Sequence, residues 1–302
     1  MKIYIVGSGG VGGYFGGLLA KAGNDVTFVA RGKHYEQIRA HGLKIKSVLG
    51  NFVIKPASVI DDISKINQPD LIFFSVKTYD SEKIAKELTR VITKETIIIS
   101  FQNGVNNDFT IKKFIKSDNI YPGVVYVISA KTQPGTIEQT GGLRSLIFGD
   151  RNHPPSEKLK NIEKLFKESG INATLSDDIS RDIWKKFMLI VAFSGITAIC
   201  RSSIGKVLSD PDTKSIYEKC VQEAIKVAKA FNINVPDDAF DDIMKKSLNT
   251  VPNSKSSLLL DIENNRKNEI ESLNGMIVKL AKEKSIDVPI NKTIYCAIKL
   301  LS

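Results

Sequence analysis

A glycine-rich segment near the start of the chain has the residue types and spacing of a phosphate-binding turn. It directly follows an apolar run at Lys2–Val6. The first glycine permits a sharp exit from a strand, the second lets backbone approach phosphates, and the last lets a helix pack closely on the sheet. Amides at the start of that helix would face the anion, so a dinucleotide site is predicted, with an unliganded turn as the alternative. The segment reads GSGGVG and consists of Gly7, Ser8, Gly9, Gly10, Val11 and Gly12.

The end of the next expected strand, Val26–Val29, indicates which dinucleotide binds. About 20 residues past the glycines, a site for NAD usually carries an acid for the ribose hydroxyls. This chain has Arg31 there, and Gly32 and Lys33 are expected to extend it into a small, positively charged loop. A guanidinium cannot accept a hydroxyl proton, but it pairs well with a phosphate. We therefore expect NADP(H) as the cofactor; the alternative for Arg31 is a solvated surface arginine.

Hydride transfer to a carbonyl also needs a proton donor beside the developing alkoxide. Histidine is the usual donor in 2-hydroxy acid dehydrogenases. The three histidines of this chain, His34, His41 and His153, all precede its helical half, and none lies in an acidic or apolar cluster. Neither a histidine acid nor a histidine-rich metal site is therefore expected.

A lysine or tyrosine should then be the acid. The Tyr-x-x-x-Lys spacings Tyr79–Lys83 and Tyr295–Lys299 would suit short-chain dehydrogenases, but exposed helix positions explain both. Lys186, at the start of an expected helix, is the better candidate, and helical spacing places Ile190 and Ser194 on its face. A lysine in this setting is more often a surface residue whose stem lies along apolar surface.

The elements that would position these residues fall into two halves. From residue 1 to about 175, strands and helices alternate, as a doubly wound sheet requires. The apolar runs Leu71–Val76 and Thr96–Ser100 are typical of strands covered on both faces, with a helix at Ser81–Leu88 between them. Further strands are expected at Tyr121–Ile128, Gly135–Gln139 and Leu146–Phe148. Pro134-Gly135 and Gly141-Gly142 separate them, so the sheet should end in antiparallel strands.

After a helix capped by Ser156, the pattern becomes wholly helical beyond about Asp178. The fold class is therefore α/β, with an N-terminal Rossmann-type doubly wound sheet over residues 1–177 and an all-helical C-terminal domain over residues 178–302. We expect the substrate in a cleft between them. The apolar stripes that predict helices are Trp184, Phe187, Met188 and Val191; Ile216, Cys220, Ala224, Val227 and Phe231; and Ile270, Leu273, Ile277 and Leu280.

The composition of the chain limits the classes of molecule that it is expected to bind. The net charge of +10 suggests anions, but the lysines alternate with glutamates and form no arginine-rich block, so a small-molecule substrate is expected rather than nucleic acid. The longest apolar run, Phe187–Phe193, is far short of the roughly 20 residues of a membrane-spanning helix. The cysteines, Cys200, Cys220 and Cys296, form no CxxC pair, which fits a reducing cytoplasm. Apolar helices of the second domain could pair two chains as a homodimer, although the sequence does not fix the oligomeric state.

Several motifs, in this order, carry a family resemblance over essentially the whole chain. They are GSGGVG, the strand-end Arg31, SVK ending at Lys77, QNG at Gln102–Gly104, WKK ending at Lys186, and SSLLLDIENNRKNEIESLNG at Ser256–Gly275. With them the chain resembles the ketopantoate reductases (2-dehydropantoate 2-reductases). The resemblance implies that NADPH reduces the ketone of 2-dehydropantoate to (R)-pantoate, on the route to pantothenate and coenzyme A, with Lys186 as the proton donor.

The same resemblance implies roles for further residues. Asn103 would contact the nicotinamide ribose and either the substrate or Lys186, and Glu269 would hold the cofactor and the lysine in place. Ser257, with Ser254 a turn earlier, would bind the substrate carboxylate. Each has a plain alternative: Asn103 begins a common turn with Gly104, Ser254 could cap a helix, and Glu269 could be an exposed charge. Lys77 and Ala130 complete the expected cofactor contacts, and Ser194 the substrate contacts.

The chain also departs from the family. Some members carry asparagines one and two helical turns after the lysine, where this chain has Ile190 and Ser194. The loss of two amides removes polar contacts to the substrate, and Ile190 adds apolar surface. The substrate could therefore be a different, bulkier 2-keto acid. The sequence is also compatible with a 3-hydroxy acid or opine dehydrogenase, and with a non-catalytic NADP(H)-sensing protein.

Overall fold

The computed structural model describes residues 1–301, and the chain forms two compact units. The first contains Met1–Gln102 and Asn106–Ile179. The second contains the chain from Ser180 onward together with the short segment Asn103–Val105. This segment leaves the first unit just after one of its strands.

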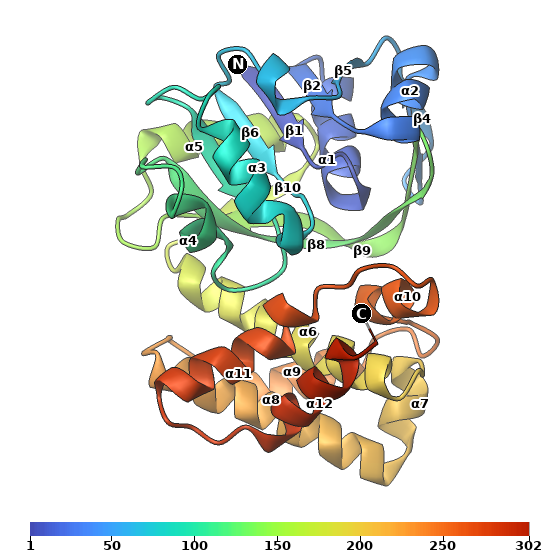
Figure 1. Cartoon of the computed structure of the whole chain (residues 1–302), viewed down its shortest axis with the longest axis vertical. Coiled ribbons are helices and arrows are strands. Elements are labelled where there is room, and N and C mark those ends of the chain that lie inside the picture. Colours follow the sequence, from blue (N-terminus) through green and yellow to red (C-terminus); the bar gives the residue numbers. More distant parts are fainter. Residues whose placement is uncertain (302) are drawn as a thin grey trace. The chain divides into compact units, whose positions relative to one another are not determined.

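The first unit is built on a parallel sheet in which β1 lies between β2 and β6 (Figure 1). The parallel strands run in the order β5-β2-β1-β6-β7-β8, which is the 3-2-1-4-5-6 order of dinucleotide-binding folds. Apolar clusters cover both faces of this sheet, so the predicted fold class is confirmed. The strands are β1 (Lys2–Val6), β2 (Asp25–Val29), β5 (Ser58–Ile60), β6 (Leu71–Phe74), β7 (Ile97–Ser100) and β8 (Ile120–Gln133).

Three helices of this unit lie where the sequence predicted them, after the glycine turn, at Ser81–Leu88 and after Ser156. The helices at Gly32–His41 and Asn107–Lys112 were not predicted, and Gly32 and Lys33 begin a helix rather than extend a loop. Ser156 caps α5, where its side chain accepts a hydrogen bond from the amide of Leu159. The helix predicted at Ser81–Leu88 has those bounds in the structure. The helices are α1 (Gly10–Lys21), α2 (Gly32–His41), α3 (Ser81–Leu88), α4 (Asn107–Lys112) and α5 (Glu157–Glu168), with short 3₁₀ turns η1 (Ile63–Lys65) and η2 (Thr78–Asp80).

Beyond β8 the sheet differs from the sequence prediction. β8 forms a long antiparallel hairpin with β9 (Thr136–Phe148), and Gly141-Gly142 does not divide β9. The glycines instead lie beside a register shift opposite Ile128, so they form a bulge rather than a turn. β3 (Leu43–Ser47) pairs with β9 on one side and with β4 (Phe52–Ile54) on the other, and β10 (Asn172–Leu175) also pairs with β9. None of β3, β4, β5 and β10 was predicted from the sequence.

Helix α1 is packed between the parallel sheet and the hairpin, which explains its glycine-rich sequence. A Cβ at Gly16 would lie 2.7 Å from Ile5 of β1. One at Gly13, one turn earlier in the helix, would lie 2.6 Å from Ile137 of β9. Because a larger residue at either position would overlap these isoleucine side chains, the glycines let the helix that follows the phosphate-binding turn lie close to both strands.

The second unit is helical, with no strand between Ser180 and residue 301. Ile216 is 41% exposed, so the predicted stripe on its helix begins one turn later, at Cys220. The helix predicted from Ile270 begins at Asn274, after a 3₁₀ turn. None of the helices in residues 1–301 is long and apolar enough to cross a membrane. The helices are α6 (Ile179–Ile199), α7 (Ile204–Ser209), α8 (Pro211–Ala230), α9 (Ala239–Leu248), α10 (Ser257–Glu263), η3 (Ile270–Ser272), α11 (Asn274–Glu283) and α12 (Pro289–Lys299).

Candidate functional site

The glycine turn has the geometry that its sequence predicts. Gly7 has φ +102°, and a Cβ there would lie 2.6 Å from the backbone of Ser75, so only glycine fits. A Cβ at Gly12 would lie 2.3 Å from the carbonyl oxygen of Gly7, which is the close helix–sheet packing expected of the third glycine. At Gly9, by contrast, a Cβ would meet nothing within 4 Å.

The open space at Gly9 fits a dinucleotide pyrophosphate. Gly9 is the N-cap of α1 and has no side chain to bind the first amides of the helix. These amides also lack partners within the helix, so they can bind an anion at its positive end. The structure therefore combines free space, amide donors and a helix N-terminus at one place, which is what a phosphate group requires.

Further contacts of the segment hold the turn in place. Ser8 is buried, and its hydroxyl donates to the carbonyl of Val29 at 2.9 Å, which ties the end of β1 to that of β2. A Cβ at Gly10 would lie 2.4 Å from the carbonyl oxygen of Ser129 and 3.0 Å from the Cα of Ala130. Ala130 therefore lies beside the start of α1, as a residue at the edge of a cofactor site would. Val11 is half-buried and packs on the core.

His34 is buried in this region, which the sequence interpretation of the histidines did not predict. The amide of Gly135 donates to its Nδ1 at 2.9 Å, so Nε2 carries the proton and donates to the carbonyl of Ser8 at 2.8 Å. Burial lowers the pKa of His34. The neutral ring thus links the glycine turn to the β8–β9 hairpin, a structural role that local sequence does not reveal because Gly135 is far along the chain.

Arg31 lies where the sequence predicts, immediately beyond β2 and ahead of α2. Its Nη2 lies 3.3 Å from Oδ2 of Asp80, which follows β6. Lys77 precedes Asp80 in the same turn and is half-buried. Basic side chains therefore follow both strands that flank β1, and Arg31 has an acidic partner that the sequence interpretation missed.

The predicted proton donor and its predicted amide partner lie together. Nζ of Lys186 donates to Oδ1 of Asn103 at 2.7 Å. Lys186 is in α6, and Asn103 belongs to the segment that clusters with the same unit. Gly104 has φ +121°, so the backbone turns sharply just after Asn103. Burial lowers the pKa of Lys186 to about 8.

Burial, and not a neighbouring cation, is the cause of this pKa shift. Lys185 is the adjacent cation, but its ammonium lies 3.3 Å from Oδ2 of Asp242 on α9. Loss of solvation, rather than repulsion by Lys185, lowers the pKa of Lys186. An ammonium with a pKa near 8 is still mostly protonated at neutral pH, yet it releases its proton more readily than an ordinary lysine.

The predicted serines lie where α10 begins. Ser256, not Ser254, caps α10, so the interpretation of Ser254 as the cap was wrong. The hydroxyl of Thr197 on α6 donates to that of Ser256 at 2.8 Å. This hydrogen bond holds the start of α10, with Ser257 exposed at its first position, against the turn of α6 that follows Ser194.

Glu269 is half-buried just before η3, where its carbonyl accepts a hydrogen bond from the amide of Ser272. The role of its carboxylate stays a prediction. No group of three or more histidine, cysteine, aspartate or glutamate side chains in the described chain could hold a metal ion.

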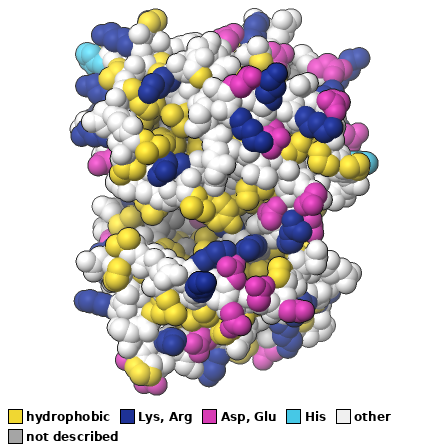
Figure 2. All heavy atoms as spheres, turned by 180° about the vertical axis from the view of Figure 1, so that it is seen from behind, with side chains coloured by type: hydrophobic (Ala, Val, Ile, Leu, Met, Phe, Trp, Pro, Cys, Tyr) yellow, Lys and Arg dark blue, Asp and Glu magenta, His cyan; other side chains and the backbone are white. Residues whose placement is uncertain are grey.

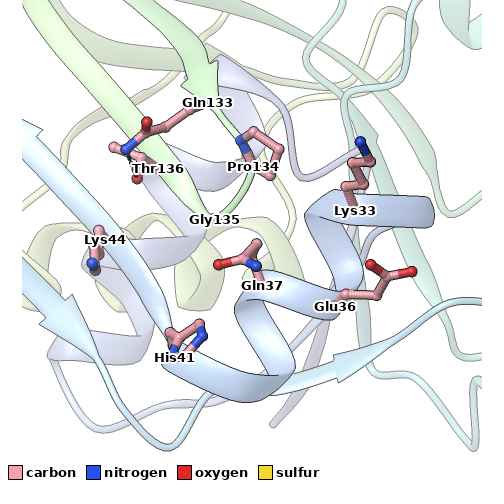
Figure 3. Close-up of a pocket in the computed structure, with 10 residues that line it drawn as sticks. Lys33, Glu36, Gln37, His41, Lys44, Gln133, Pro134, Gly135 and Thr136 are labelled. Atoms are coloured by element: carbon pink, nitrogen blue, oxygen red, sulfur yellow. Dashed lines mark hydrogen bonds between the residues drawn. The ribbon is translucent and has the colours of Figure 1, made fainter.

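A separate cavity of about 440 Å³ contains none of the predicted site residues. Figure 3 shows that its side chains come from α2, from the start of β3 and from the β8–β9 turn. On the face seen in Figure 2, basic side chains lie among acidic ones within each unit. The cavity is lined by Lys33, Glu36, Gln37, His41, Gly42, Lys44, Gln133, Pro134, Gly135 and Thr136.

Comparison with known proteins covers both units. The family model described as "Ketopantoate reductase PanE/ApbA" matches residues 3–153, and the model of its C-terminal region matches residues 178–302. A 2-dehydropantoate 2-reductase of Archaeoglobus fulgidus is 30% identical, with 97% of this chain and 95% of that protein covered.

Solved structures are also similar to this chain over nearly its whole length. A PanE/ApbA family ketopantoate reductase from Ralstonia eutropha has a TM-score of 0.93 and 29% identity, covering 100% of this chain and 98% of that one. A D-mandelate dehydrogenase in complex with NADH has a TM-score of 0.86 and 25% identity, covering 98% and 96%. The chain belongs to the ketopantoate reductase family of oxidoreductases.

Proposed function

We propose that this enzyme reduces 2-dehydropantoate to (R)-pantoate with NADPH, with Lys186 as the proton donor. The observation that carries the proposal is the 2.7 Å hydrogen bond from Lys186 to Asn103, made by an ammonium whose pKa is lowered to about 8. A surface lysine would have neither a fixed amide partner nor a desolvated head group. Membership of the ketopantoate reductase family supports the same reaction.

We propose that residues 1–177 hold the cofactor. The first-turn amides of α1 would bind the pyrophosphate at Gly9, and Arg31 and Lys77 would bind the 2′-phosphate. When bound, NADPH supplies the hydride that reduces the ketone carbon of the substrate.

Lys186 would act on the oxygen of that ketone. Its ammonium stabilises the negative charge that develops there and then gives up a proton, which leaves an alcohol and a neutral amine. At pH 7, one unit below a pKa of about 8, about nine-tenths of the lysines are protonated and ready to act as the acid. Asn103 would hold the ammonium in place, because its amide oxygen accepts one of the three N–H bonds.

The remaining site residues would orient the substrate. Hydroxyl groups suit a carboxylate because they can donate to it without adding charge. We assign this role to Ser257 and Ser254, with Ser194 on the α6 side, and assign to Glu269 the positioning of the cofactor and Lys186.

A second candidate is the reduction of another 2-keto acid by the same chemistry. Ile190 lies one helical turn from Lys186, so the surface next to the proton donor is partly apolar. The similarity to a D-mandelate dehydrogenase supports a substrate with an apolar substituent. A sensor protein without catalysis is less well supported, because it needs no desolvated acid.

The test follows NADPH absorbance while purified protein is offered 2-dehydropantoate and a panel of 2-keto acids with small, branched and aryl substituents. Preference for 2-dehydropantoate, by kcat/KM, supports the first proposal. Preference for an aryl or branched acid supports the second. NADPH that binds but is not oxidised with any acid would refute both and favour a sensor.

A further inference from the structure

The residue expected to bind the 2′-phosphate has an acidic partner in this structure. Nη2 of Arg31 lies 3.3 Å from Oδ2 of Asp80. Arg31 follows β2 and Asp80 follows β6, and β1 lies between these strands. The ion pair therefore spans the end of β1, where the glycine turn begins.

The carboxylate of Asp80 is not used to start a helix. Asp80 is the N-cap of α3, a position at which aspartate usually accepts a hydrogen bond from the first amides. Its side chain makes no such bond. Its backbone amide donates to the carbonyl of Lys77 at 2.9 Å, which holds the backbone in place, and the side chain is paired with Arg31. The carboxylate of Asp80 therefore pairs with the guanidinium of Arg31 and does not cap the helix.

The ion pair contributes little to folding but matters for an anionic ligand. The side chains of Arg31 and Asp80 are 62% and 33% exposed, and such exposed pairs stabilise proteins only slightly. A 2′-phosphate carries up to two negative charges, however, and would be attracted by Arg31 and repelled by Asp80. A ribose hydroxyl has no charge and can donate to a carboxylate, which is the contact that sites for NAD use.

We propose that Asp80 sets the cofactor selectivity of this enzyme by offsetting the charge of Arg31, so that NADPH is only weakly preferred over NADH. This inference rests on the proposed function, since it requires a nicotinamide dinucleotide at the glycine turn. In this proposal Arg31 favours binding of the 2′-phosphate, and Asp80 disfavours it.

The test replaces Asp80 with asparagine, which keeps the shape of the side chain and removes its charge. Dissociation constants for NADPH and NADH are measured by calorimetry for the full-length wild type and Asp80→Asn. The matched control is Glu82→Gln, which removes one exposed charge from the first turn of α3. Thermal unfolding checks that both variants are folded.

We expect Asp80→Asn to tighten NADPH binding about five- to tenfold, on the scale of one exposed charge pair acting on a doubly charged group. NADH binding should be unchanged or weaker, and Glu82→Gln should alter neither. An unchanged or lower NADPH preference in Asp80→Asn, with both dinucleotides still bound by the wild type, would overturn the role of Asp80 alone. Failure of the wild type to bind either dinucleotide would refute the proposed function and this inference with it.

Discussion

Replacing Gly9 with alanine separates ligand binding from folding at the glycine turn. A Cβ at Gly9 meets nothing within 4 Å, and the residue has φ −79°, which any L-amino acid adopts. The variant should therefore fold normally, with a free energy of unfolding within about 1 kcal/mol of the wild type. If the open space receives a pyrophosphate, however, the methyl group must obstruct it.

The expected cost to binding follows from overpacking. One methyl group forced into a well-packed contact costs about 1–3 kcal/mol. NADPH binding should therefore weaken by about 5- to 150-fold. Gly12→Ala should behave differently, because its Cβ would lie 2.3 Å from the carbonyl of Gly7 and must disturb the fold itself.

Calorimetric titration with NADPH and urea unfolding of the same samples measure the two effects. Gly141→Ala is the control for loss of a glycine elsewhere, since its Cβ would make only an ordinary 3.5 Å contact with Ile128. Wild-type NADPH affinity in folded Gly9→Ala would show that no phosphate lies at this turn, and the cofactor assignment would fail.

Three further predictions test the acid and the packing of the first unit. Lys186→Ala should lower turnover about 100-fold or more without changing NADPH affinity, whereas Lys185→Ala should stay within a few-fold of wild type; equal rates for the two would remove Lys186 from the mechanism. The lowered pKa of His34 means that stability is complete above the unfolded pKa of about 6.5 and is lost as pH falls below it. The drop in Tm between pH 7.5 and 5 should therefore be smaller in His34→Gln, and an identical drop would contradict this. Arg151→Met leaves the carboxylate of Asp108, which is 1% exposed, without the guanidinium 2.8 Å away. It should cost roughly 3 kcal/mol in urea unfolding, and a loss below about 1 kcal/mol would count against a buried pair.

The sequence predicted those parts of the fold that local pattern determines. β1, β6 and β7 contain continuous apolar runs because both faces of the sheet are covered. β3 and β5 are short and half-exposed, and their partners are distant: β3 pairs with β9, more than 90 residues later. The alternation of apolar and polar residues in β3, LKIKS, does indicate a strand, whereas the three residues of β5 are too few to show a period.

The candidate site follows the same rule. Lys186 and Asn103 were predicted from motifs, and the structure joins them by a hydrogen bond. The burial of His34 depends on a hairpin 101 residues away, and the partner of Arg31 lies 49 residues away. These contacts are made by the tertiary fold, and residue types near His34 or Arg31 carry no signal for them.

The pH dependence of kcat in the direction of reduction, with NADPH and keto acid saturating, tests most directly whether Lys186 is the acid. An ammonium whose pKa is lowered to about 8 must be protonated to act. The rate should therefore be constant near neutrality and fall about tenfold per pH unit well above 8. A rate that does not change between about pH 7 and 10, or a Lys186→Ala variant with the rate and profile of the wild type, would contradict proton donation by Lys186.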